Sequence, residues 1–149
     1  MIYVLDTDIL SLLAHADSPH APRIRRRIAE IPADDSIVTT VINYEEQIRG
    51  WMAALSAARS AQSEIRVYGR LLLHLAAYRR MSVLPFDHAA SEIVKGLREQ
   101  RLKVGAMDLK IASIVLAVDG CLVTRNVADF QKVSGLQIED WSIDDGYRP

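Results

Sequence analysis

Acidic and amide side chains that suit metal chemistry stand at four separate places in this sequence. They are Asp6, Asp8, Glu45, Glu46, Asp108, Asn126 and Asp129. Carboxylates that meet at one site cannot all stay ionised unless cations neutralise them. Because no matching set of Lys or Arg accompanies these acids, we expect a hard divalent cation. Mg²⁺ and Mn²⁺ take oxygen ligands and leave positions for water and phosphate oxygens.

Each of these acids also has a structural explanation when it is taken alone. Asp6 and Asp8 can cap a helix. Asp108 can sit at a helix N-terminus because of the helix dipole, and Glu46 can be a solvated helix residue. The joint arrangement favours the metal site. Asp6 directly follows four apolar residues and Asp108 has apolar neighbours, so both carboxylates are partly desolvated and need a partner.

The elements that must position these residues alternate along the chain. Apolar and β-branched runs predict strands at 2–5, 36–41, 81–85, 121–124 and 136–139. Helical spacing predicts a first helix that starts at residue 8. It predicts further helices at 23–31, 43–60, 61–80, 87–98, 106–118 and 127–132. We expect Thr7 or Asp8 to cap the first helix and Asp87 to cap the helix that ends at 98.

This alternation of strands and helices predicts an α/β fold. Right-handed crossovers should give a mostly parallel sheet of four or five strands, sandwiched between helices. In such sheets the ligand site lies beyond the carboxyl ends of the strands. The acids stand at or near these ends, so we expect them to converge.

Length and composition are those of one globular domain, which we expect to span residues 1–149 with a helical hairpin at about 43–80. With 18 Lys and Arg against 19 Asp and Glu, bulk charge does not favour a protein that coats nucleic acid. The single Cys121 excludes an internal disulfide framework. Asp6 and Asp8 interrupt the apolar stretch that a signal peptide needs, and no apolar run is long enough for a membrane span. We therefore expect a cytoplasmic protein.

Four segments carry a resemblance to a known family. YVLDTDIL opens the chain, NYEEQIRG holds an acid four residues before its Gly, VGAMDLKIA follows, and VTRNVADFQKVSGLQIEDW closes the series. In this order they resemble the four acidic motifs of PIN-domain ribonucleases, and among these the VapC-type toxins of bacterial type II toxin–antitoxin pairs. The resemblance covers Ile2 to Trp141. It implies a PIN-like α/β/α sandwich and a hydrolase that cleaves RNA internally with Mg²⁺ or Mn²⁺.

The resemblance also implies the site residues. Asp6, Glu46 and Asp108 match the family's three most regular acids, so we expect them to be catalytic and to bind the metal. Asn126 stands where many relatives have Asp, and Asp129 is the nearest ionised alternative for this fourth position. The implied mechanism is in-line attack of a metal-activated water on the phosphodiester.

Other side chains near the motifs have expected supporting roles. Those that can orient the metal ligands by hydrogen bonds are Thr7, Asp8 and Thr124. Those that can contact RNA phosphates are Arg125, beside the fourth motif, and Arg23 and Arg26 in the basic run 23–27. A solvated helix face is the alternative explanation for that basic run.

Two other functions fit parts of the sequence. The strand before Asp6 is similar to the opening of haloacid-dehalogenase-type phosphatases, in which the first Asp is a phosphorylated nucleophile. However, Leu10 stands where that family has Thr or Val, and the Asp144–Asp145 pair comes too late for its last acidic motif. The other alternative is a PIN module that has lost catalysis and only binds RNA or protein, and Asn126 is the one feature in its favour.

The predicted hairpin carries more apolar residues than one buried face requires. They include Ile48, Trp51, Met52, Leu55, Leu71, Leu72 and Leu75. The resemblance implies a small VapB-like antitoxin as a partner. We place this partner in a groove between the two helices and expect a homodimer through another face. Packing of the hairpin upon itself is the alternative.

Overall fold

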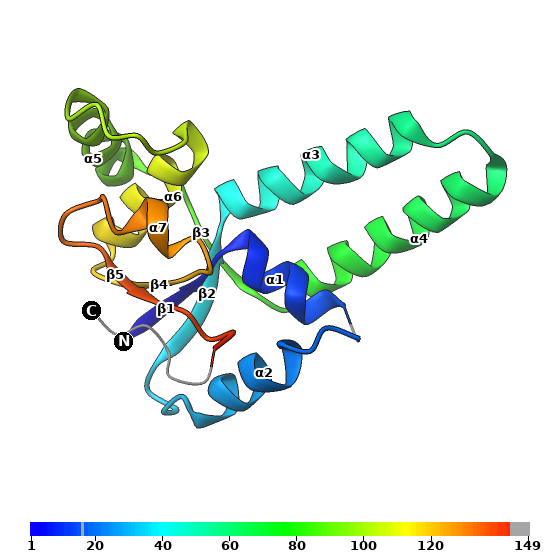
Figure 1. Cartoon of the computed structure of the whole chain (residues 1–149), viewed down its shortest axis with the longest axis horizontal. Coiled ribbons are helices and arrows are strands. Elements are labelled where there is room, and N and C mark those ends of the chain that lie inside the picture. The colour runs from blue at the N-terminus through cyan, green and yellow to red at the C-terminus, as the bar shows by residue number, and fades with distance from the viewer. Residues whose placement is uncertain (16, 144–149) are drawn as a thin grey trace.

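Five parallel strands form the centre of the computed structural model, which describes residues 1–15 and 17–143 (Figure 1). The strands are β1 (Ile2–Leu5), β2 (Ser36–Thr40), β3 (Ser82–Leu84), β4 (Cys121–Val123) and β5 (Gln137–Glu139). Their order in the sheet is β3-β2-β1-β4-β5, and every pairing between neighbours is parallel. The prediction of an α/β fold with a mostly parallel sheet is confirmed. The Asp144–Asp145 pair lies outside the described residues.

The position of β1 in the middle of the sheet determines which loops meet. Val4 of β1 is in register with Val38 of β2 on one side and with Leu122 of β4 on the other. Because the strands are parallel, their carboxyl ends lie at the same edge. The residues that follow β1, β2 and β4 therefore face one another across this edge.

Helices cover both faces of the sheet. They are α1 (Thr7–Ala14), α2 (Ala21–Glu30), α3 (Val41–Ala57), α4 (Ala61–Tyr78), α5 (His88–Glu99), α6 (Ala106–Ala117) and α7 (Val127–Phe130). Successive side chains of a strand point to opposite faces. Accordingly, Val4 belongs to an apolar cluster with Ile111 of α6, whereas Leu5 belongs to a second cluster with Ile24 of α2. This is the α/β/α sandwich that the resemblance implied.

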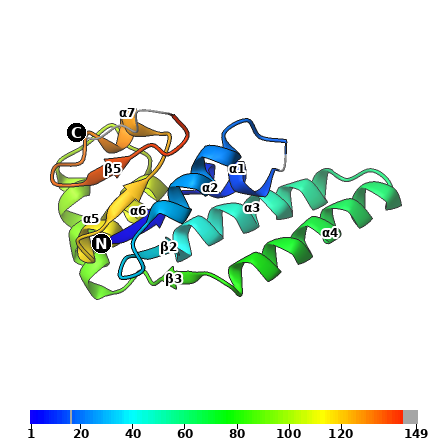
Figure 2. The ribbon, with the colours of Figure 1, turned by 90° about the horizontal axis from the view of Figure 1, so that it is seen from below.

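Helices α3 and α4 run side by side and extend away from the sheet (Figures 1 and 2). No residue of α4 is buried. Where the pair meets the sheet, the Tyr78 hydroxyl donates a hydrogen bond of 2.7 Å to Gln47 Oε1, which joins the end of α4 to α3. In the described part of the chain, neither these helices nor any other is long and apolar enough to cross a membrane.

Side chains cap the helices that begin at the site edge. Asp6 caps α1, and its carboxylate accepts a hydrogen bond of 2.8 Å from the Thr7 backbone N–H. The prediction that Thr7 or Asp8 caps this helix was wrong. β1 passes into α1 without a loop, so Asp6 is the residue left in the extended conformation that a cap needs. Asp87 caps α5, as predicted.

Candidate functional site

Asp6 is the buried centre of the acidic site, with 6% of its surface exposed. Its Oδ1 accepts hydrogen bonds from the Thr7 backbone N–H at 2.8 Å and from Asn43 Nδ2 at 2.9 Å. Its Oδ2 accepts a bond of 2.7 Å from Thr124 Oγ1. Burial raises the pKa of Asp6, and these hydrogen bonds to the charged form oppose the rise. The carboxylate is thus fixed in place where the fold disfavours its charge.

Glu46 lies in the second turn of α3 and is linked to the first motif through Thr7. The Thr7 hydroxyl donates a hydrogen bond of 2.6 Å to Glu46 Oε2 and accepts one of 3.0 Å from Asn43 Nδ2. Burial raises the pKa of Glu46, and the negative charge of Asp6 adds to this rise. The second acidic motif is therefore joined to the first by hydrogen bonds, while the negative charges of Asp6 and Glu46 repel each other.

Asp108 lies in the first turn of α6 and is half-buried. Burial raises its pKa to about 6, and the nearby negative charges add to the rise. Those charges belong to Asp6, Glu46 and Asp129. The structure thus brings acids from four segments within electrostatic reach of one another. Among the described residues, the salt bridges formed by Lys and Arg include none to Asp6, Glu46 or Asp108.

Asp8 joins the first motif to the turn after β4. Its Oδ2 accepts a hydrogen bond of 2.9 Å from the Arg125 backbone N–H. Its Oδ1 is buried and has no hydrogen-bond partner among the described residues. Burial raises the pKa of Asp8 to about 6, and the charge of Asp6 contributes to the same shift. Asp8 therefore adds a further carboxylate to the site, with one oxygen still unsatisfied.

Asn126 and Asp129, the two candidates for the fourth position, contact each other. The Asn126 backbone N–H donates to Thr124 Oγ1 at 3.0 Å, and its side chain donates to Asp129 Oδ2 at 3.4 Å. Lys132 Nζ lies 2.5 Å from Asp129 Oδ1, and this bond lowers the pKa of the exposed Asp129 carboxyl. Asp129 is therefore charged and tied to a cation, whereas Asn126 lies closer to the buried Thr124.

The side chains that could bind a metal ion at this site are mainly carboxylates. In the described ranges, no three His, Cys, Asp or Glu side chains stand close enough together to hold one ion. The chemistry of the donors nevertheless fits a hard cation. They are carboxylate oxygens whose pKa values are raised by burial and mutual repulsion, and the Asp8 Oδ1 atom lacks a partner. The residue types at the site therefore fit Mg²⁺ or Mn²⁺.

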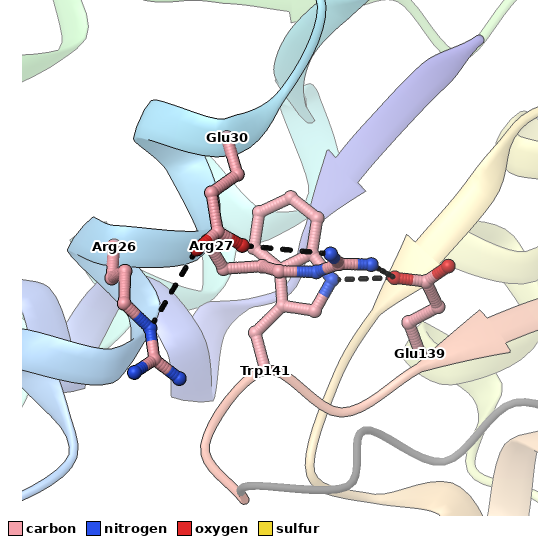
Figure 3. A network of polar contacts seen from close by, with 5 residues as sticks. All are labelled: Arg26, Arg27, Glu30, Glu139 and Trp141. Carbon is pink, nitrogen blue, oxygen red and sulfur yellow. Dashed lines mark hydrogen bonds and ion pairs between the residues drawn. The ribbon is translucent and has the colours of Figure 1, made fainter.

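In the basic run on α2, Arg27 takes part in packing and Arg26 is exposed. Arg27 donates to Glu139 Oε2 at 3.3 Å and lies 6.0 Å from the centre of the Trp141 ring, whose Nε1 donates to the same Glu139 oxygen at 2.7 Å (Figure 3). Arg26 pairs with Glu30 at 3.8 Å with its side chain 68% exposed, and Glu30 also pairs with Arg27 at 3.8 Å (Figure 3). The contacts of Arg27 connect α2 to β5 and to Trp141, which follows this strand.

The predicted RNA-contacting arginines differ in their surroundings. Arg125 is exposed and follows Thr124 at the acidic site. Arg23 donates a hydrogen bond of 3.4 Å to the Ser142 backbone oxygen, on the side of the sheet that α2 covers. Direct linkage to the acidic site is thus observed for Arg125, through its bond to Asp8.

Sequence reasoning did not identify Asn43 as part of the site. It is fully buried at the start of α3 and contacts both Asp6 and Thr7. With Thr40 it forms a reciprocal cap, in which each backbone N–H donates to the other residue's side chain. A Thr followed three residues later by Asn was the available signal. It indicates a helix start, but it does not reveal that the amide faces an acid.

A groove of ≈ 410 Å³ lies between α3 and α4. Its lining residues are Tyr44, Ile48, Met52, Tyr68, Leu71, Leu72, His74 and Leu75. Most of the apolar residues expected there line it, but Trp51 and Leu55 do not. The Trp51 ring instead packs edge-on against the His74 ring at 6.2 Å, so it helps to hold the two helices together. For Trp51, packing of the hairpin upon itself is thus the better explanation.

Known proteins resemble this chain in sequence and in structure. No family model matches the chain. The protein named Ribonuclease VapC1 from Haemophilus influenzae strain R2866 is 28% identical over 146 residues, which cover 95% of this chain and 99% of that protein. A tRNA(fMet)-specific endonuclease VapC from Shigella flexneri is 37% identical over 67 residues, or 42% of this chain and 51% of that protein. The structure of VapBC-1 from nontypeable H. influenzae matches with a TM-score of 0.71 and 28% identity, covering 96% of this chain and 100% of that chain.

Proposed function

We propose that this chain is a VapC-type PIN-domain ribonuclease, that is, an endoribonuclease that hydrolyses RNA phosphodiester bonds with Mg²⁺ or Mn²⁺. Its similarity to Ribonuclease VapC1 and to the VapBC-1 structure over nearly the whole chain supports this proposal. One observation carries the metal-dependent chemistry. Asp6, Glu46 and Asp108 repel one another electrostatically, and no salt bridge from the described residues neutralises them. Uncompensated carboxylates at one site favour a bound cation.

The proposed ligands differ in how they are held. Asp6 accepts three hydrogen bonds and Glu46 accepts one from Thr7, whereas Asp108 is partly exposed. Asp129 or Asn126 completes the set. When bound, the ion lowers the pKa of an attacking water and neutralises charge on the phosphate and on the leaving oxygen.

The surrounding residues position these ligands and the substrate. Thr124 and Thr7 hold Asp6 and Glu46 through their hydroxyls. Asp8 holds the turn that carries Arg125, and the exposed Arg125 guanidinium is suited to binding an RNA phosphate. Arg23 and Arg26 are proposed as secondary phosphate contacts, because α2 presents a basic run.

We also propose that the chain is the cytoplasmic toxin of a toxin–antitoxin pair. The H. influenzae neighbour was solved as VapBC-1, which motivates a VapB-like antitoxin as partner here. Its proposed binding site is the groove between α3 and α4, where Tyr68 is 58% exposed and Leu72 is 68% exposed. A homodimer would form through another face. Such a partner would restrain the proposed nuclease.

The test is an RNA cleavage assay with the purified chain. We expect internal cleavage that stops with EDTA, returns with Mn²⁺ or Mg²⁺, and is lost in Asp6→Asn and Asp108→Asn. Glu92→Gln is the matched control, because this exposed acid lies on α5 and pairs with Lys95. Cleavage that survives chelation would refute the metal-dependent mechanism. An acid-labile phosphoryl group on Asp6 would support the phosphatase instead, and RNA binding without cleavage would support an inactive module.

A further inference from the structure

We infer that Asn43 is the positioning residue that holds the carboxylates of Asp6 and Glu46 together as one unit, through a single buried amide. The inference rests on the proposed function, because it concerns how two of the proposed ligands are held. Asn43 carries no charge and contributes no atom to the reaction. Its role follows from the direction of each hydrogen bond that it makes.

The orientation of the Asn43 amide is fixed by its neighbours. Asn43 Oδ1 accepts from the Thr40 backbone N–H at 3.3 Å and from Thr40 Oγ1 at 2.6 Å. A backbone N–H can only donate, so the oxygen of the amide must face Thr40. The amide nitrogen therefore faces the opposite way, toward the first motif. The flipped amide would set two N–H groups against each other.

Both N–H groups of the amide are used on the first motif. Asn43 Nδ2 donates to Asp6 Oδ1 at 2.9 Å and to Thr7 Oγ1 at 3.0 Å. The Thr7 hydroxyl accepts this bond and has one proton of its own. That proton is donated to Glu46 Oε2 at 2.6 Å. One amide thus fixes Asp6 directly and Glu46 through one hydroxyl.

The environment of Asn43 makes this arrangement rigid. Its side chain is fully buried, and all four hydrogen-bonding positions of its amide are occupied. Thr40, which anchors the amide, is also fully buried. Through Asn43, Thr40 at the end of β2 is therefore connected to Asp6, which directly follows β1. Such a network lets the two carboxylates keep one geometry before any cation arrives.

The chain contains a matched control for the capping role of Asn43. Ser60 and Ser63 make the same reciprocal cap at the start of α4, where Ser60 is exposed and Ser63 is half-buried. Ser63→Ala removes a cap of this kind without touching the acidic site. A loss that arises only from a weakened helix start should therefore appear in both variants.

The experiment compares Asn43→Leu, Thr7→Val, Thr7→Ser and Ser63→Ala with the wild type. In crystal structures of the metal-free proteins, we expect displaced Asp6 and Glu46 side chains in Asn43→Leu and a displaced Glu46 alone in Thr7→Val. Mn²⁺ affinity, measured by calorimetry, should fall about 10- to 100-fold in Asn43→Leu, the usual range when a residue behind a metal ligand is lost. Thr7→Ser and Ser63→Ala should keep the wild-type affinity. The Asn43→Leu/Thr7→Val double variant should lose less than the product of the two single losses.

The inference is overturned if Asn43→Leu keeps both carboxylates in their wild-type positions, or if Ser63→Ala loses as much Mn²⁺ affinity as Asn43→Leu. If Asn43→Leu does not fold, Thr7→Val decides, and an undisplaced Glu46 in that variant overturns the inference. A wild-type protein that binds no Mn²⁺ would contradict the proposed function. The metal-free crystal structures would still decide the role of Asn43, so the two failures are distinguishable.

Discussion

Thr124 Oγ1 donates a hydrogen bond of 2.7 Å to Asp6 Oδ2 although 118 positions separate the two residues in the chain. The bond exists because β1 and β4 are neighbours in the sheet, with Leu5 in register with Val123. Each residue directly follows its strand. The parallel sheet thereby connects the first and last acidic motifs at one buried point.

Thr124→Val should therefore impair both stability and catalysis. Loss of the hydroxyl leaves a buried carboxylate oxygen without its donor, which costs about 1–3 kcal/mol of unfolding free energy. The pKa of Asp6 should rise further, and RNA cleavage should fall about 10- to 100-fold. Urea unfolding and initial cleavage rates measure the two effects. Thr124→Ser, which keeps the hydroxyl, should recover most of both, and a failure to do so would contradict this role of the bond.

The metal-free protein should lose stability as pH rises through the window set by Asp8 and Asp108. Their pKa values are raised to about 6, above the ordinary value of 3.8. Between these values the folded state holds protons that the unfolded state has released. The unfolding free energy therefore falls with rising pH, and the stabilisation present at the acid end is lost above pH of about 6.

Asp108→Asn isolates this contribution from the rest of the titration. Without metal, the variant should become more stable than the wild type as pH rises from about 4 to about 7. We expect a difference on the order of 1 kcal/mol, because solvent screens a half-buried carboxyl. Urea unfolding in EDTA across this range measures it. Added Mn²⁺ should stabilise the wild type more than the variant. A constant difference at all pH values would contradict the prediction.

Arg27 should prove structural and not part of RNA binding. Arg27→Met removes the ion pair with Glu139 and the contact with Trp141, so we expect a loss of about 1 kcal/mol of unfolding free energy. The cleavage rate should stay at the wild-type level. Arg125→Ala should do the reverse, with weaker RNA binding and unchanged stability. Salt-dependent binding measurements and urea unfolding separate the two outcomes.

The groove prediction can be tested on two residues of the same helix. Leu72 and Ile65 are similarly exposed on α4, at 68% and 65%, but only Leu72 is among the groove residues. With the antitoxin co-expressed, Leu72→Asp should abolish co-purification of the partner, and Ile65→Asp should not. Both should leave thermal stability nearly unchanged, because both side chains already face solvent. Equal retention of the partner by both variants would place its site elsewhere.

The strand and helix order was predictable from the sequence because each apolar run is short and followed by a clear breaker or cap. The boundaries of α3 were harder to predict than this order. β2 ends at Thr40 and α3 begins at Val41, two residues before the predicted start, because the Thr40–Asn43 cap lies inside a run that looks β-branched throughout. Contacts between side chains far apart in the sequence could not be predicted from it. Neither Arg27 with Glu139 nor Asn43 with Asp6 has a signature in hydrophobic periodicity.

Mn²⁺ soaked into crystals of the wild-type protein, and located by its anomalous scattering, tests the central claim that the carboxylates form a metal centre. We predict a peak at coordination distance, about 2.0–2.2 Å, from Asp6 and from Glu46 or Asp108. The same peak should be absent in Asp6→Asn crystals. The contradicting result is a wild-type protein that cleaves RNA with Mn²⁺ while no peak lies at these acids.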